Sequence, residues 1–307
     1  MPSTSTALVR LARTYPGSTF LATTLLTLFL PSLAHRARTS YRDFLALGHG
    51  ALPPTRAGWL AALVCRAVLG RDAEADAAAF VRQVEGDESL EEGWLTEEDV
   101  PLREGERPDL MKYPIPQRHL IPHPSASLAE AQLAHLASLA ARFPAHLRLG
   151  DSRLERGGPA LFVLRDSAPG ATPRPDLDLD LTAGELVHLH RGPYGFPLSP
   201  LPTATSSPNP HLHPGPAAES LHVVLCPRDA ALVLRRGWGV RHPLASTGAG
   251  DVADAPCWLW RWLWGKVGKW ALPQGYVLVY APRDEREAGV QRRIVEAGVR
   301  WATGVEL

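Results

Sequence analysis

A chain of 307 residues with 45% hydrophobic content can bury a sizeable core, and its length fits one large domain or two small ones. Its 32 basic and 32 acidic residues balance and form no long block of one sign, so we expect no nucleic-acid partner. The three cysteines are far apart and lack a Cys-x-x-Cys spacing, which argues against a disulfide framework and a structural zinc site.

The first predicted element is an almost uncharged, apolar helix over residues 17–34 with arginines on both sides. About 20 apolar residues are needed to span a bilayer, so this segment predicts a single-pass membrane anchor over residues 1–40. The flanking arginines favour a cytosolic location for the rest of the chain. A cleaved signal peptide is the alternative, because basic residues precede the apolar run and Ser32-Leu33-Ala34 resembles a cleavage site.

Residues 41–124 are predicted to form a helical and extended, proline-rich region. An apolar helix at 57–69 is too short to span a membrane and is interpreted as a core helix, or as a helix at a membrane interface. A second helix is expected at 73–84. Six prolines between Pro101 and Pro124 exclude regular helix there and predict an extended strap.

Residues 125–307 alternate between helical and strand patterns. The expected elements are helices at 127–143, 226–236 and 284–301 and strands at 146–149, 160–164, 184–190, 221–225 and 275–280. Strands in hairpin order with helices before, between and after them predict an α+β fold, in which flanking helices pack on a mostly antiparallel β-sheet.

A tryptophan-rich segment from Trp258 to Trp270 lies in one of the long connections and contains Lys266 and Lys269. Tryptophans beside lysines are typical of membrane interfaces. The segment is therefore interpreted either as a second membrane-docking point or as a lid packed on the domain.

Four histidines fall in or next to the predicted strands. Side chains two apart on a strand point to the same face, so His188 and His190 project together. A hydrogen-bonded neighbouring strand would bring His222 to about 5 Å from a residue on the first strand. His242 follows a Gly-Trp-Gly turn that we expect to end beside these strands. The pattern predicts one pocket lined by imidazoles, against the ordinary alternative of a polar network that only holds the sheet.

These motifs carry a family resemblance. The order Glu185-Leu-Val-His188-Leu-His190, Leu221-His222, Gly237-Trp-Gly-Val-Arg-His-Pro-Leu244 and Tyr280-Ala-Pro-Arg-Asp284 resembles the fungal luciferase family, whose luminous members oxidise 3-hydroxyhispidin. The likeness covers most of the chain after the predicted anchor. Insertions after His190 and after Leu244 depart from the luminous members, so neither their substrate nor their light emission is carried over to this chain.

The resemblance implies an oxygenase that needs only its substrate and dioxygen, without a metal or an organic cofactor. In such an enzyme a neutral imidazole removes a proton from an acidic aromatic or pyrone enol, and a cation holds the anion while dioxygen attacks. The residues expected to carry this chemistry are His188, His190, His222, His242 and Arg241. The residues expected to bind the substrate are Trp238, Glu185, Asp229, Tyr280 and Arg283.

Several alternatives stay open. Asp229 as a helix cap and Glu185 as an exposed side chain are ordinary interpretations of those two carboxylates. His188, His190 and His222 also match a ligand set for iron or zinc, in a metal-dependent oxygenase or hydrolase. A third alternative is a non-catalytic, membrane-attached protein that binds a small molecule. An enzyme is favoured, and the sequence predicts no oligomeric state.

Overall fold

The structure is a computed structural model of the chain. It describes residues 14, 16–46, 52–69, 73–113, 115, 117–118, 126–155, 158–164, 184–190, 220–246 and 272–307. The chain divides into two compact units, Met1–Ala46 and Leu47–Leu307. The predicted tryptophan-rich segment at 258–270 and the insertion that follows His190 lie outside the described residues.

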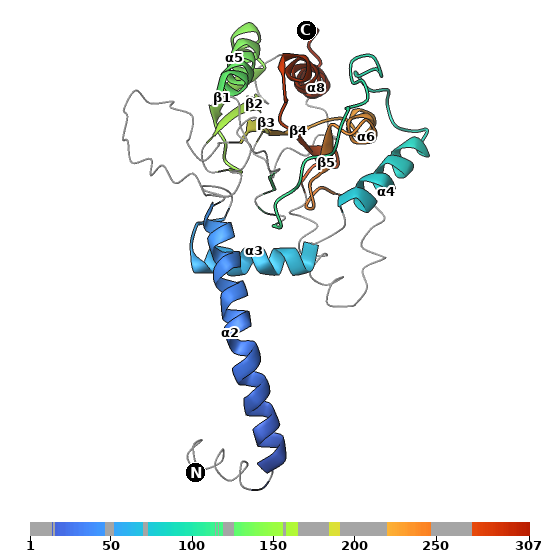
Figure 1. The fold of residues 1–307 in the computed structure, drawn as a ribbon. Coiled ribbons are helices and arrows are strands. Elements are labelled where there is room, and N and C mark those ends of the chain that lie inside the picture. The colour runs from blue at the N-terminus through green and yellow to red at the C-terminus, as the bar shows by residue number, and fades with distance from the viewer. Residues whose placement is uncertain are drawn as a thin grey trace, which may run out of the picture. The chain divides into compact units, whose positions relative to one another are not determined.

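The described part of the N-terminal unit is helical. Helix α2 (Pro16–Ala46) is 31 residues long and continues through Pro31 (Figure 1). Threonines and serines dilute its apolar run, and Arg36 and Arg38 follow in the same helix. Within the described residues, no helix combines the length and the apolar character needed to cross a bilayer. The predicted single-pass membrane anchor is therefore not supported.

The second unit is built on a six-stranded sheet in which every neighbouring pair is antiparallel. The strands lie in the order β1, β2, β3, β4, β6, β5. They are β1 (Leu147–Asp151), β2 (Pro159–Val163), β3 (Glu185–Leu189), β4 (Leu221–Val224), β5 (Gly239–Arg241) and β6 (Tyr276–Val279). This sheet confirms the predicted α+β fold, and β5 is the strand that the sequence pattern did not predict.

Helices accompany this sheet in the described part of the second unit. They are α3 (Arg56–Leu69), α4 (Ala73–Glu85), α5 (Ala126–Arg142), α6 (Pro227–Arg235) and α8 (Glu285–Thr303). Helices α5 and α8 cover one face of the sheet, whereas α4 and α6 pack together beside β5 (Figure 1). The predicted helices are confirmed. In α3, however, Leu60 and Val64 are exposed, so this predicted core helix buries only one side.

Local sequence explains where the two helices that follow the histidine-bearing strands begin and where the first of them ends. Cys226 caps α6 with its sulfur, and Pro227 takes the first helical position, where a missing N–H costs nothing. Asp284 caps α8 with its carboxylate. Gly237 follows α6 with a φ of 78°, a conformation that residues with a Cβ rarely adopt.

The two faces of the sheet carry different side chains, because consecutive strand residues alternate between them. Val187, Val223 and Val277 belong to the apolar core on the face that α5 and α8 cover. The opposite face presents His188 and His222, which are direct cross-strand partners. The histidines are therefore separated from the helix-covered core by the sheet itself.

A β-bulge in β3 changes which side chains share the histidine face. Two successive residues of β2 pair with Glu185 and Val187, so Leu186 between them is an extra residue without a cross-strand partner. Residues three apart on a regular strand face opposite sides of a sheet. The bulge shifts this alternation and lets Glu185 reach His188.

Candidate functional site

Three imidazoles converge on the face of the sheet away from α5 and α8. His188 and His222 face each other across β3 and β4, and His190 follows directly after β3, where its backbone N–H donates to the carbonyl of Ser220. Nδ1 of His222 lies 3.0 Å from Nε2 of His188 and 2.9 Å from Nε2 of His190. All three side chains are buried. We refer to His188, His190 and His222 as the histidine cluster.

The ring nitrogens that point away from the centre of the cluster also have partners. Each of them contacts an oxygen atom at hydrogen-bond distance. These contacts join Nδ1 of His188 to Oε1 of Glu185 at 2.7 Å, Nδ1 of His190 to Oγ of Ser220 at 2.7 Å, and Nε2 of His222 to Oε1 of Gln117 at 3.0 Å. Every imidazole of the cluster is thus held in orientation from outside.

Glu185 contacts His188 on the side away from the centre of the cluster. Its carboxylate accepts hydrogen bonds from the hydroxyl of Ser152 at 2.7 Å and from the backbone N–H of Arg153 at 2.8 Å. Its side chain is 1% exposed, so the alternative of an exposed Glu185 is wrong. Glu185 belongs to the site, where its contacts orient His188, and its predicted substrate-binding role stays a prediction.

A buried ion pair lies beside the histidine cluster. Arg118 donates to both carboxylate oxygens of Glu155, at 2.9 Å for Oε1. Oε1 of Glu155 also lies 3.8 Å from Nε2 of His188. Burial opposes ionisation of Glu155, but the charge and hydrogen bonds of Arg118 outweigh it and hold the pKa of this carboxyl below its ordinary value. The cluster therefore has an ionised carboxylate beside it.

His242 and Tyr276 extend the group of rings. The ring of Tyr276 stacks on His222 at a centroid distance of 5.0 Å, and the ring of His242 meets His222 at 5.2 Å. Burial, followed by repulsion from His188, lowers the pKa of His242 to about 3. Burial likewise lowers the pKa of His222 well below 6.5, so both imidazoles are neutral near pH 7.

Arg241 points elsewhere, although it precedes His242 in the chain. Its guanidinium pairs with Asp76 of α4 at 3.2 Å, donates to the carbonyl of Ala245 and lies 4.7 Å above the ring of Phe80. Neighbouring residues of a strand face opposite sides, which explains the separation from His242. The structure thus places the guanidinium of Arg241 against α4 and not against the histidines, while its predicted role as an anion stabiliser stays a prediction.

Trp238, Tyr280 and Arg283 gather around a different centre. The guanidinium of Arg103 lies 5.6 Å from the ring of Trp238 and 5.3 Å from the ring of Tyr280. Arg103 and Arg283 both donate to the carboxylate of Glu287, at 3.0 Å and 2.8 Å. These contacts fasten the start of the strap to the end of β6 and to α8, and the predicted substrate-binding roles of the three residues stay predictions.

Asp229 contacts another part of the chain. Its carboxylate accepts the backbone N–H groups of Trp94 at 3.1 Å and Leu95 at 2.9 Å. Burial raises the pKa of this carboxyl, although the two N–H donors oppose that shift. Asp229 thus ties the segment before the strap to α6, which differs both from the predicted substrate contact and from a simple cap of its own helix.

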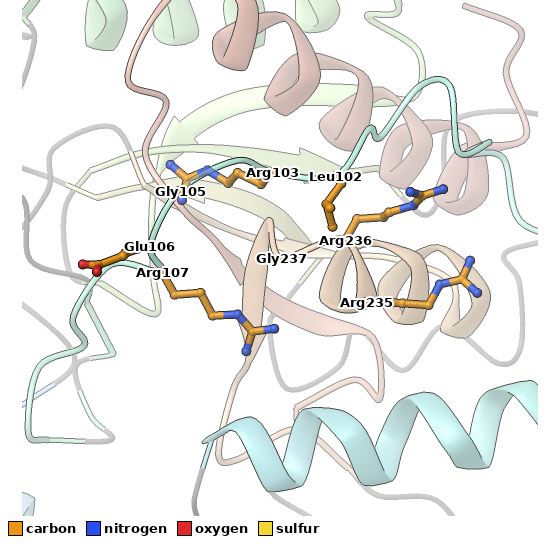
Figure 2. A pocket seen from close by; sticks show the side chains of 8 residues that line it. All are labelled: Leu102, Arg103, Gly105, Glu106, Arg107, Arg235, Arg236 and Gly237. Atoms are coloured by element: carbon orange, nitrogen blue, oxygen red, sulfur yellow. The ribbon is translucent and has the colours of Figure 1, made fainter.

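A separate cavity lies between the strap and the end of α6 (Figure 2). Its lining is Leu102, Arg103, Gly105, Glu106, Arg107, Arg235, Arg236 and Gly237. Each of its four arginines is paired with a carboxylate: Arg103 with Glu287, Arg107 with Glu74, Arg235 with Glu85 and Glu97, and Arg236 with Glu97. In Figure 2 the guanidinium groups do not converge on one point. The charges are used in structural ion pairs, which leaves little attraction for an anionic ligand.

Gln117, Arg118 and Glu155 were not predicted as site residues. Gln117 and Arg118 stand in the proline-rich strap, whose sequence shows no periodicity that would place it on the sheet. Glu155 is a single acidic residue in the connection between β1 and β2. No local pattern signals that these side chains meet the histidines, because the contacts join distant segments. Gln117 lies 105 positions from His222, and Arg118 lies 37 positions from Glu155.

The cluster and its carboxylate form a set of possible metal ligands. Glu155, His188, His190 and His222 each offer one ligand atom, and these atoms lie within 4.8 Å of one another. All four residues are buried. The three histidines that the sequence offered as an alternative ligand set thus lie together, with Glu155 as an addition.

Comparisons with known proteins indicate the family to which the chain is similar. The family model described as Luciferase domain matches residues 210–298, a range that contains His222 and His242. The C-terminal third of the chain is thus similar to the luciferase domain. No solved structure matches the chain.

Curated relatives extend the similarity to most of the chain. It is 27% identical over 270 residues to proteins named Luciferase from Armillaria gallica and Armillaria mellea, covering 87% of this chain and 81% of each relative. It is 26% identical over 273 residues to a protein named Luciferase from Neonothopanus nambi, with the same coverage. The resemblance drawn from the sequence is confirmed: the chain is similar to fungal luciferases over most of its length.

Proposed function

We propose that this protein is a luciferase-like oxygenase that oxidises a small aromatic or pyrone enol with dioxygen. The observation that carries the proposal is the buried convergence of three imidazole nitrogens beside an ionised carboxylate, in a chain related to fungal luciferases. A buried site of this kind excludes water, and its unprotonated imidazole nitrogens can accept a proton from an acidic substrate. Both properties suit the oxidation of an enol.

The chemistry balances without an external reductant. Loss of the enol proton to a base leaves an enolate, and its electron-rich carbon forms a C–O bond with dioxygen. The substrate supplies the electrons, dioxygen is reduced to a carbon-bound peroxide, and the peroxide takes up a proton. The required co-substrate is therefore dioxygen alone, and no organic cofactor is proposed.

Two neutral groups beside the cluster can act as hydrogen-bond donors to a developing anion. Nδ1 of His242 accepts the backbone N–H of Leu244 at 3.1 Å, so the ring proton of this neutral imidazole resides on Nε2. Burial raises the pKa of Tyr276 well above 10, so its phenol keeps its proton. We propose these two side chains for the role that the sequence assigned to Arg241.

Oxygen uptake tests the proposal. The full-length protein would be incubated in air with a panel of hydroxylated pyrones that includes 3-hydroxyhispidin, and light would be recorded in parallel. We expect consumption of oxygen in proportion to an oxidised product, and a loss of about 10²–10⁴-fold in the His222→Ala variant, the range typical of general acid–base catalysis. His135→Ala, which alters a histidine on α5, is the control. Tight retention of a pyrone without oxygen uptake would instead identify a binding protein.

A further inference from the structure

We propose that Glu155, His188, His190 and His222 bind a divalent first-row transition-metal ion. This inference rests on the proposed function in that it concerns the same centre, but metal content can be measured whether or not the protein turns over a substrate. It replaces the expectation of a metal-free site by one in which the imidazoles are ligands.

The hydrogen bonds of Gln117 determine the tautomer of His222. The side-chain amide of Gln117 donates through Nε2 to the carbonyl of Arg241 at 3.1 Å, so its Oε1 is the atom that faces His222. An amide oxygen only accepts, and Nε2 of His222 must therefore carry the ring proton. In the neutral imidazole, Nδ1 of His222 is then a bare lone pair that points into the cluster.

Nε2 of His188 places a second lone pair opposite the one on Nδ1 of His222. Nδ1 of His188 lies 2.7 Å from the carboxylate of Glu185 and is the nitrogen that donates. Nε2 of a neutral His188 is then a lone pair as well, at 3.0 Å from Nδ1 of His222. Two lone pairs at this distance repel each other unless a cation lies between them. The cation is either a proton or a metal ion.

A single proton can satisfy only one of the close contacts between the ring nitrogens of the histidine cluster. Nδ1 of His222 has a second nitrogen, Nε2 of His190, at 2.9 Å, and the carboxylate of Glu155 lies 3.8 Å from His188. A metal ion accepts lone pairs from all four groups at once. Oxygen partners on the outer ring nitrogens, as at Glu185 and Ser220, are also the usual means by which proteins orient metal-binding histidines.

The spacing of the nitrogens fits ligands that share one ion. Imidazole nitrogens bind zinc at about 2.0–2.1 Å, so two ligands at a right angle around an ion at this distance lie about 2.8–3.0 Å apart. The observed separations of 2.9 Å and 3.0 Å match this arrangement. Ligands gathered on one side of an ion leave open positions on the other, and imidazole with carboxylate suits iron as well as zinc.

Elemental analysis tests the inference directly. The full-length protein would be purified without a polyhistidine tag or chelator, and metals would be counted per chain by inductively coupled plasma mass spectrometry. A second sample would be stripped with a chelator and reloaded separately with Fe²⁺, Mn²⁺, Zn²⁺ or Co²⁺. We expect about one ion per chain after reloading, and a visible absorption band from bound Co²⁺.

Variants distinguish the proposed metal ligands from residues that only lie near them. Glu155→Gln and His190→Ala should each lower metal affinity by at least about 10-fold, because the first removes the negative charge of a ligand and the second removes an imidazole. His242→Phe is the matched control: its ring lies 5.2 Å from that of His222, but it is outside the set of four and should keep the metal. Circular dichroism would confirm that each variant is folded before its metal is counted.

The outcomes distinguish this inference from the proposed function. Stoichiometric metal that depends on Glu155 and His190 supports the inference even if no pyrone is oxidised. Failure of the folded wild-type protein to bind any of the four ions overturns it, and continued oxygen uptake under that condition would leave the proposed function standing with the imidazoles as bases. Equal metal loss in His242→Phe and His190→Ala would also overturn the assignment of these ligands.

Discussion

Gln117 and His222, which are 105 positions apart in the chain, share a hydrogen bond of 3.0 Å between Oε1 and Nε2. The same amide donates to the carbonyl of Arg241 at 3.1 Å, so it cannot rotate without losing both contacts. The strap is therefore part of the site, because it determines which nitrogen of His222 faces the cluster.

Replacing Gln117 by alanine should impair the site without unfolding the sheet. Removal of a residue that orients a ligand typically costs about 10–100-fold in metal affinity or activity. Oxygen uptake and metal content would be measured on the same preparation. Glu106→Ala, an exposed change in the same strap, is the control, and equal behaviour of the two variants would contradict the role given to Gln117.

The Arg118–Glu155 pair should be important for stability as well as for the site. Both side chains are buried, so Arg118→Met leaves the carboxylate of Glu155 without its partner and should lower the free energy of unfolding by about 3–5 kcal/mol. The double variant Arg118→Met/Glu155→Leu should recover much of this loss, since it leaves no unpaired charge. Urea denaturation of the three proteins measures the difference. A double variant no more stable than Arg118→Met would count against the pairing.

Stability should decline on mild acidification. The pKa of His242 is about 3 in the folded protein, whereas an unfolded histidine titrates near 6.5. Between these values the unfolded state binds more protons, so the free energy of unfolding falls as the pH falls, by up to about 1.4 kcal/mol per unit. His222, whose pKa is also lowered, acts in the same direction. Urea denaturation from about pH 7.5 to 5.5, across the unfolded pKa, would show the slope, and His242→Phe should make it shallower.

Arg241 should affect stability and not chemistry. Its guanidinium is 2% exposed and holds Asp76 of α4, which is 12% exposed. Arg241→Leu should destabilise the fold by a few kcal/mol through the unpaired carboxylate. Well below its lowered melting temperature, the folded variant should still consume oxygen within a few-fold of the wild type. A loss of about 100-fold or more in the folded variant, the scale of a lost catalytic group, would restore the role that the sequence suggested.

Residues 47–307 should fold without the N-terminal helix, because the chain divides into compact units at residue 46. We expect the truncated protein to be monodisperse, with a melting temperature within a few degrees of that of the full chain. Flotation of both forms with lipid vesicles would test the predicted anchor independently. Vesicle binding that is lost on truncation would support it, and absence of binding by the full chain would refute it.

The sequence by itself determined most of the helices and strands and the histidines of the site, but not the partners of those histidines. Capping at Cys226 and Asp284, glycine at the end of α6 and alternating apolar residues in the strands depend on neighbours in the chain, and these elements were predicted. The two-residue spacing of His188 and His190 likewise follows from strand geometry.

Tertiary structure alone decided the rest. The bulge at Leu186 turns Glu185 toward His188, and strand alternation directs Arg241 away from the cluster, toward Asp76. Arg118 and Glu155 reach the cluster from a strap and a loop that have no periodic pattern. Such contacts depend on strand register and on the path of irregular backbone, which arise when distant segments bury their polar groups together, and short-range sequence patterns do not contain that information.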